Sequence, residues 1–162
     1  MRITRILGLD PSYTETGYAV INFTDLKVIE AGSIRTKPTS TEWERLSAIH
    51  DALRSIVLAH ELSFAAIETP FVGKNPLTAI KLASVRGIGL FACHSAGIPI
   101  ALYAPAQVKA TLTGRPHADK GAVAGIARGI TGFTTANHNI SDAIAIAICG
   151  ALKWKEGQLL HA

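Results

Sequence analysis

The sequence predicts an α/β fold, and three observations lead to this class. Short apolar runs at residues 6–10 and 64–68 have the length and composition of buried strands. Segments with helix-start signals, near Thr41 and Asn75, alternate with such runs. The chain has 162 residues, 48% apolar and 17% charged, which suffices for one domain with a sizeable core but not for two. We therefore expect a single domain over residues 1–162.

Five strands and a first helix follow from the local pattern. The predicted strands span residues 3–10, 17–23, 27–34, 63–69 and 98–103, of which the first three form a meander. A helix begins near Thr41, because Thr41 and Glu44 fit a capping box. Its apolar stripe comprises Leu46, Ile49, Leu53, Ile56 and Val57.

A second helix is predicted over residues 75–95. Asn75 is a suitable N-cap, Pro76 fits the first helical position, and Gly97 follows the end. Its apolar residues leave no wide polar face, so the helix should be buried on two sides. A second helix or a second subunit could cover the second side, and we favour a homodimer interface, for which small residues would permit close approach. These are Ala83, Ser84, Gly87 and Gly89.

The run at residues 143–148 leaves strand and helix open. Alanine and isoleucine alternate in it with the period of a strand. Alanine is also the strongest helix former and nothing in the run is polar, so a fully buried helix fits equally well. Periodicity alone does not decide between them.

Three carboxylates stand at the ends of apolar runs. Asp10 and Glu68 each end a predicted strand, and Asp142 opens the run at residues 143–148. A buried carboxylate must be paired or bind a metal, and no basic residue adjoins Asp10 or Glu68 in sequence. Singly, each acid could belong to a turn, a strand end or a helix start. Together they predict an oxygen-ligand site for a hard divalent cation.

The net charge of +4 is unevenly distributed. Between Glu68 and Asp142 a single acid, Asp119, stands among seven cations. They are Lys74, Lys81, Arg86, Lys109, Arg115, Lys120 and Arg128. A solvated basic face is the plain interpretation, but cations bracketed by candidate metal ligands are what a phosphodiester-cleaving enzyme needs.

The cysteines and apolar runs bear on localisation. Cys93 and Cys149 lack a Cys-x-x-Cys spacing and lie in apolar surroundings, which indicates reduced thiols of an intracellular protein rather than zinc ligands. The opening apolar stretch is short and interrupted, and no run is predicted to reach membrane-spanning length. We therefore expect a soluble cytoplasmic protein with no membrane partner.

Several segments, in order along nearly the whole chain, resemble the RuvC family of Holliday junction resolvases. They lie at residues 7–20, 66–75, 103–109, 118–120 and 142–147. The resemblance implies an RNase H-like fold, with a five-stranded mixed sheet whose first three strands are antiparallel and which is flanked by helices. It also implies that the run at residues 143–148 is helical.

The resemblance further implies a metal-dependent endonuclease of DNA recombination and repair. It would act as a homodimer on four-way junction DNA, with a branch-migration complex as a further partner by the same resemblance. Asp10, Glu68 and Asp142 would hold two Mg²⁺ or Mn²⁺ ions, and Lys120 would act beside them. Paired symmetric nicks would leave 5′-phosphate and 3′-hydroxyl ends.

The DNA contacts implied by the resemblance begin with Lys109 and Lys120, which should contact phosphates near the cleaved strand. Phe71 should reach a base at the opened junction, although a core position after a strand would explain it as well. The remaining candidate DNA contacts are Lys74, Asn75, Lys81, Arg86 and Arg115.

One position departs from the family pattern. Members commonly have an acid, or in some a histidine, three residues before the last aspartate, and here that residue is Asn139, next to His138. Either could complete the metal site. Alternatively, Asn139 could cap the last helix, and His138 could be a solvated loop residue.

Three other functions share some of these sequence features. An RNase H-like ribonuclease would share the fold and metals but recognise 2′-hydroxyls. A sugar-kinase or actin-like ATPase needs a second domain that this length excludes. A non-catalytic junction-binding protein would keep the basic surface, but it has no need of the three carboxylates.

Overall fold

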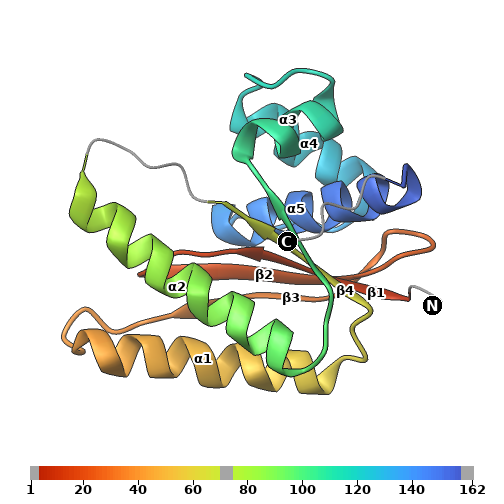
Figure 1. Ribbon diagram of the computed structural model, residues 1–162. Coiled ribbons are helices and arrows are strands. Elements are labelled where there is room, and N and C mark those ends of the chain that lie inside the picture. Colours follow the sequence, from red (N-terminus) through yellow and green to blue (C-terminus); the bar gives the residue numbers. More distant parts are fainter. Residues whose placement is uncertain (1–3, 70–74, 158–162) are drawn as a thin grey trace.

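The computed structural model describes residues 4–69 and 75–157 (Figure 1). Its strands are β1 (Arg5–Asp10), β2 (Glu15–Asn22), β3 (Val28–Arg35), β4 (Phe64–Glu68) and β5 (Ile100–Tyr103). Its helices are α1 (Glu42–Ala59), α2 (Pro76–Ser95), α3 (Pro105–Thr113), α4 (Lys120–Thr131) and α5 (His138–Lys155). The five predicted strands and the helices that begin after Thr41 and Asn75 are confirmed, whereas α3 and α4 are absent from the sequence prediction.

The strands form one mixed sheet in the order β3-β2-β1-β4-β5. The pairs β1–β2 and β2–β3 are antiparallel, and the pairs β1–β4 and β4–β5 are parallel. This confirms the predicted five-stranded sheet with its first three strands antiparallel. Because β1 and β4 are parallel neighbours, their carboxyl ends meet at one edge of the sheet.

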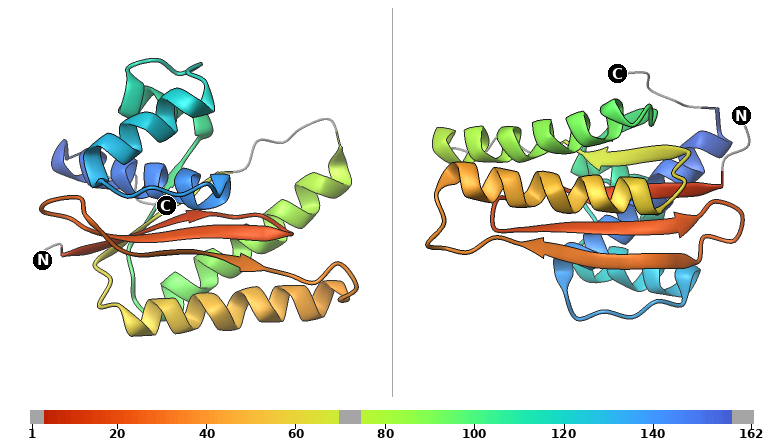
Figure 2. Two further views of the ribbon diagram at one scale, coloured as in Figure 1. Left: turned by 180° about the vertical axis from the view of Figure 1, so that it is seen from behind. Right: turned by 90° about the horizontal axis from the view of Figure 1, so that it is seen from below.

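Helices cover both faces of the sheet (Figures 1 and 2). One face packs against α1 and α2, and the other against α5, which is in turn covered by α3 and α4. Side chains of a strand alternate between the faces. Accordingly, Leu7 and Leu9 of β1 lie in the core beneath α1 and α2, while Ile6 lies in the core beneath α5.

The alternating run at residues 143–148, for which strand and helix were both possible, lies in helix α5. Residues 143–151 are all buried in the helix, as the resemblance implies. Its N-cap is Asn137, whose side chain accepts hydrogen bonds from the backbone N–H groups of Asn139 and Ile140. The suggested N-cap at Asn139 is therefore wrong by two residues, and His138 is the first helical residue rather than a loop residue.

Helix α2 differs from its prediction. It packs on α1, but only Val85, Gly89, Ala92 and Cys93 are buried, because no element of the described protomer covers its outer side. The expected burial on two sides is thus absent within one protomer. By length and composition alone, α2 could span a membrane, which corrects the prediction that no run reaches that length. A core helix of a soluble protein meets the same two criteria, so this finding is weak evidence for a membrane.

Candidate active site

Asp10 and Glu68 are brought together by strand pairing. The parallel register joins Leu9 of β1 to Ile67 of β4, so the next residue of each strand stands beside the other at the sheet edge. Leu9 and Ile67 face the core beneath α1 and α2. Alternation therefore directs both carboxylates to the opposite face, where α5 lies.

Asp142 reaches this edge because α5 lies unusually close to the sheet. A Cβ atom at Gly8 would collide with the carbonyl oxygen of Ala143, and one at Gly17 would collide with that of Asn139. Gly17 is also the strand partner of Asp10. The two glycines thus allow the start of α5 to lie directly over β1 and β2.

Lys120 connects the acids. It is the first residue of α4, and its Nζ donates a hydrogen bond to Asp142 Oδ2 at 2.8 Å. That hydrogen bond is the main cause of the raised pKa of Lys120, and the charges of Asp142, Asp10 and Glu68 contribute in turn. Lys120 therefore acts on all three predicted carboxylates and does more than begin a helix.

A cavity of about 240 Å³ opens at this cluster. Its polar lining is supplied by Glu68, Lys109, Lys120 and Asp142. The rest of the lining is Pro105, Val108, Val123 and Ala145. The structure thus brings together two predicted carboxylates and two predicted phosphate-binding lysines from four elements.

The acids carry more negative charge than Lys120 compensates. Burial, followed by the charge of Asp142, raises the pKa of Asp10 to about 7. Burial, followed by the charges of Asp10 and Asp142, raises the pKa of Glu68 to about 7. A pKa raised by neighbouring acids indicates a place where additional positive charge would be stabilised.

The donor set fits a hard divalent cation. Carboxylate oxygens are the ligands that Mg²⁺ and Mn²⁺ prefer. Within residues 4–69 and 75–157, no three Asp, Glu, His or Cys side chains lie close enough together to hold a metal ion by themselves. Lys120 supplies the counter-charge instead, through its contact with Asp142.

The two candidates for completing the site lie differently. The backbone of Asn139 lies against Gly17, next to Asp10 in the sheet. Its side chain is partly buried, whereas His138 is exposed. The structure therefore brings Asn139 closer to the carboxylate cluster through its backbone position.

The remaining predicted DNA contacts are dispersed. The side-chain amide oxygen of Asn75 caps α2. Lys81 Nζ lies 5.0 Å from the centre of the Tyr13 ring, and Arg115 is exposed after α3. Arg86 is partly buried, and its Nε has no hydrogen-bond partner among the described residues. Phe71 and Lys74 lie outside the described residues.

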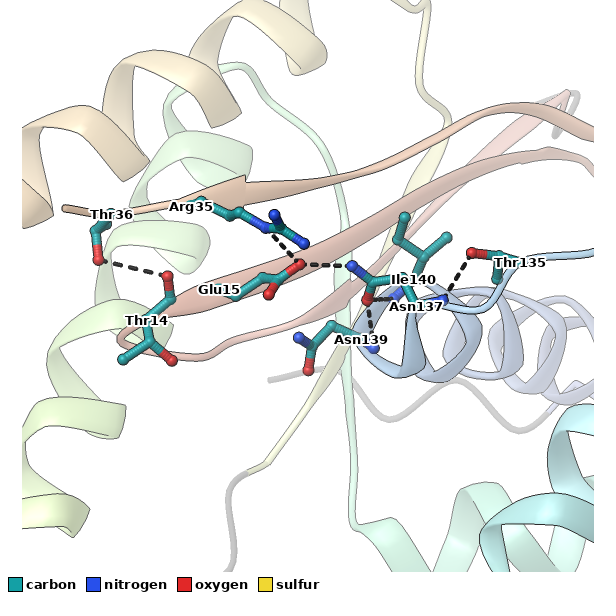
Figure 3. Close-up of polar contacts among 8 residues, drawn as sticks. All are labelled: Thr14, Glu15, Arg35, Thr36, Thr135, Asn137, Asn139 and Ile140. Atoms are coloured by element: carbon teal, nitrogen blue, oxygen red, sulfur yellow. Dashed lines mark hydrogen bonds and ion pairs between the residues drawn. The ribbon is translucent and has the colours of Figure 1, made fainter. Parts of the chain in front are cut away.

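Two features near the site are absent from the sequence prediction. Arg45 lies 5.0 Å from the Tyr13 ring, which therefore has two cations, Arg45 and Lys81, over it. Glu15 forms an ion pair with Arg35 and accepts a hydrogen bond from Asn137 (Figure 3). The N-cap role of Asn137 has a local signal in the sequence, whereas its contact with Glu15 and the Tyr13 cluster depend on tertiary contacts.

Comparisons with known proteins agree with this geometry. The family model described as Crossover junction endodeoxyribonuclease RuvC matches residues 6–150. The crossover junction endodeoxyribonuclease RuvC of Halorhodospira halophila is 36% identical over 151 residues, which cover 92% of this chain and 90% of that protein.

Two solved structures are similar over nearly the whole chain. The Thermus thermophilus RuvC structure matches with a TM-score of 0.89 and 28% identity, covering 98% of this chain and 99% of that one. The structure of T. thermophilus RuvC in complex with Holliday junction substrate matches with a TM-score of 0.91 and 30% identity, at the same coverage. These matches confirm the RNase H-like fold.

Proposed function

The chain belongs to the RuvC family of crossover junction endodeoxyribonucleases, and on this premise we propose that Asp10, Glu68 and Asp142 bind the divalent cations with which it cuts four-way DNA junctions. It resolves Holliday junctions in homologous recombination and DNA repair by paired symmetric nicks. The products carry 5′-phosphate and 3′-hydroxyl ends, which a ligase can seal.

One observation carries the assignment of the site. Three carboxylates from β1, β4 and α5 act on a single ammonium group, Lys120, and the pKa values of Asp10 and Glu68 are raised to about 7. Two carboxyl groups that ionise this reluctantly favour a ligand with more positive charge than one lysine supplies. A pair of Mg²⁺ or Mn²⁺ ions meets this requirement.

The protein's own residues position the DNA for the reaction. Held by Asp10, Glu68 and Asp142, cations of this kind would supply the activation of a water molecule and the stabilisation of the leaving 3′ oxygen. Lys109 and Lys120 border the cavity beside Glu68 and Asp142, where they can hold the phosphates that flank the scissile bond. Lys120 also reduces the negative charge that the acids present to an approaching phosphate.

We assign Asn139, rather than His138, as the residue that completes the metal site through its amide oxygen. An amide replaces the charge of the commoner acid with a neutral oxygen ligand, so one ion should bind more weakly. Mn²⁺ should then support cleavage at lower concentration than Mg²⁺, which requires stricter octahedral oxygen coordination.

The active form is a homodimer. A two-fold symmetric junction needs two equivalent sites if both strands are to be cut symmetrically. Leu77, Ile80 and Phe91 on the outer side of α2 are exposed by 69%, 60% and 59%, which supports an interface there.

The proposed location of the protein is the cytoplasm. Its two cysteines, Cys93 and Cys149, are free thiols, as is usual in a reducing compartment.

The test is a nicking assay on a labelled synthetic mobile junction, with Mg²⁺ and Mn²⁺ in parallel. Asp10→Asn should abolish cleavage and preserve junction binding, because no phosphate-contacting cation is removed. Asp25→Asn makes the same charge change in the exposed β2–β3 turn and should cut like the wild type.

An Asp10→Asn variant that cuts at a near wild-type rate would refute the metal-site assignment. A matched four-way junction made of RNA separates the main alternative. Faster cleavage of RNA than of DNA would favour a ribonuclease.

A further inference from the structure

The carboxylate of Glu15 links two elements on the active-site edge of the sheet (Figure 3). Glu15 begins β2, two residues before Gly17, which pairs with Asp10. Its Oε1 accepts a hydrogen bond from Asn137 Nδ2 at 2.5 Å and lies 3.0 Å from Arg35 Nε. These partners belong to the residue that caps α5 and to the end of β3.

Asn137 uses both ends of its amide. Its Oδ1 accepts from the N–H groups of Asn139 at 2.9 Å and Ile140 at 3.3 Å, while its Nδ2 donates to Glu15. The helix cap needs an acceptor and the Glu15 carboxylate needs a donor, so this orientation of the amide satisfies both. Aspartate would cap the helix as well but has no donor for Glu15, and the O–H donor of serine stands on a shorter side chain than the Asn137 amide.

Close packing also joins α5 to the sheet near the site, where Gly8 and Gly17 lie against Ala143 and the Asn139 backbone. Within residues 4–69 and 75–157, the hydrogen bond that joins β2 to the start of α5 is the one between Glu15 and Asn137. This bond is directional, whereas packing against a glycine is not. Asp142 follows on the same helix, five residues after Asn137.

We propose that Glu15 and Asn137 are a positioning pair for the reaction: their hydrogen bond fixes where α5 begins on β2 and so holds Asp142 in place beside Asp10. This inference rests on the proposed metal site, whose geometry the pair would set. Neither residue need touch the metal or the DNA.

Two variants with the wild-type net charge test the pair. Asn137→Ser keeps a capping oxygen and replaces the Nδ2 donor to Glu15 with a hydroxyl on a shorter side chain. The double variant Glu15→Gln with Asn137→Asp keeps the cap and rebuilds the link with donor and acceptor exchanged, because the glutamine amide can donate to the new carboxylate. Lys153→Gln is the control, since it breaks the 2.8 Å contact with Glu156 at the far end of α5.

Mn²⁺ binding to the DNA-free protein is measured by electron paramagnetic resonance, next to the Mn²⁺ concentration for half-maximal nicking and the thermal midpoint. Asn137→Ser should raise both Mn²⁺ concentrations by roughly tenfold, as loss of outer-shell support does at other metal sites. The double variant should recover most of this loss. Lys153→Gln should bind Mn²⁺ like the wild type.

Unchanged Mn²⁺ binding in Asn137→Ser, or a loss that the double variant does not recover, would overturn the proposal. Asp10→Asn, measured alongside, separates this failure from that of the metal site. If Asp10→Asn loses Mn²⁺ binding while Asn137→Ser does not, only the positioning pair is refuted. If Asp10→Asn binds Mn²⁺ normally, the metal site itself is refuted.

Discussion

Helices α5 and α2 are both apolar on nearly every side, yet they have different surroundings. Helix α5 lies between the sheet and helices α3 and α4, and nine consecutive residues of it are buried. Helix α2 packs on α1 and one edge of the sheet, and its outer side exposes Leu77, Ile80 and Phe91. An apolar surface predicts that a helix is covered, but it does not identify the covering partner.

The difference also separates two roles. Helix α5 carries Asp142 to the carboxylates of β1 and β4, so its burial positions the site. Helix α2 carries Lys81 and Arg86 and exposes apolar side chains, which is what the proposed homodimer interface requires.

The largest difference should come from one substitution made in each helix. Ile146→Glu in α5 places a carboxylate where the wild-type residue is 0% exposed, and it should cost more than about 4 kcal/mol and prevent folding. Ile80→Glu in α2, at 60% exposure, should leave a folded monomer. Circular dichroism and light scattering measure folding and mass.

An Ile80→Glu protein that remains dimeric would place the interface elsewhere. A wild-type protein that is monomeric at micromolar concentration and still resolves junctions would remove the homodimer altogether.

The cost of covering the site with α5 can be measured through pH. Burial and the charge of Asp142 raise the pKa of Asp10 from 3.8 to about 7, so between pH 4 and 7 the folded protein binds more protons than the unfolded chain. The free energy of unfolding of the metal-free protein therefore falls as pH rises through this window. Asp10→Asn should raise the free energy of unfolding of the metal-free protein by on the order of 2–4 kcal/mol at pH 8 and change it little at pH 4.

Urea unfolding in EDTA at the two pH values provides the comparison, with Asp25→Asn in the exposed turn as control. Equal stability of Asp10→Asn and wild type at pH 8 would show that α5 imposes no such cost on the carboxylate.

The smallest predicted effects concern glycines. Gly8→Ala should destabilise by roughly 1–3 kcal/mol, because the methyl group would collide with the α5 backbone at Ala143. The methyl group added by Gly87→Ala in α2 has no neighbour within 4 Å, so this substitution should stabilise the helix by up to about 1 kcal/mol. Thermal unfolding in the Ile80→Glu background measures the protomer alone. Destabilisation by both substitutions would mean that the outer side of α2 is covered within the protomer.

Much of the fold could be predicted because its signals are local. Strand runs, the Thr41 capping box and the Asn75 N-cap are readable from neighbouring residues, and all three are confirmed. The carboxylates could be singled out because charge at the end of a buried strand is costly. Their meeting at one edge depends on β1 and β4 being parallel neighbours, a pairing that the structure shows and the local pattern does not give.

Other features could not be predicted because they depend on tertiary contacts. Asn137 and Asn139 are equally plausible caps in sequence, and only the backbone of α5 shows that Asn137 makes the hydrogen bonds. The contact of Glu15 with Asn137 joins residues 122 positions apart. The exposed side of α2 shows that an apolar pattern cannot distinguish a helix face buried within the protomer from one that the protomer leaves exposed.

Mixed dimers of wild-type and Asp142→Asn protomers test most directly whether each protomer cuts one strand. The two protomers are co-expressed with different affinity tags, and the mixed dimer is purified through both tags. In the proposed homodimer each protomer has its own site, with Asp142 on α5, and the protomers pair through α2, so a mixed dimer should bind a four-way junction and nick one strand without resolving it. Wild-type dimers should nick two opposite strands, and Asp142→Asn dimers none. Full resolution by the mixed dimer would contradict one site per protomer, and a complete absence of nicks would contradict the independence of the two sites.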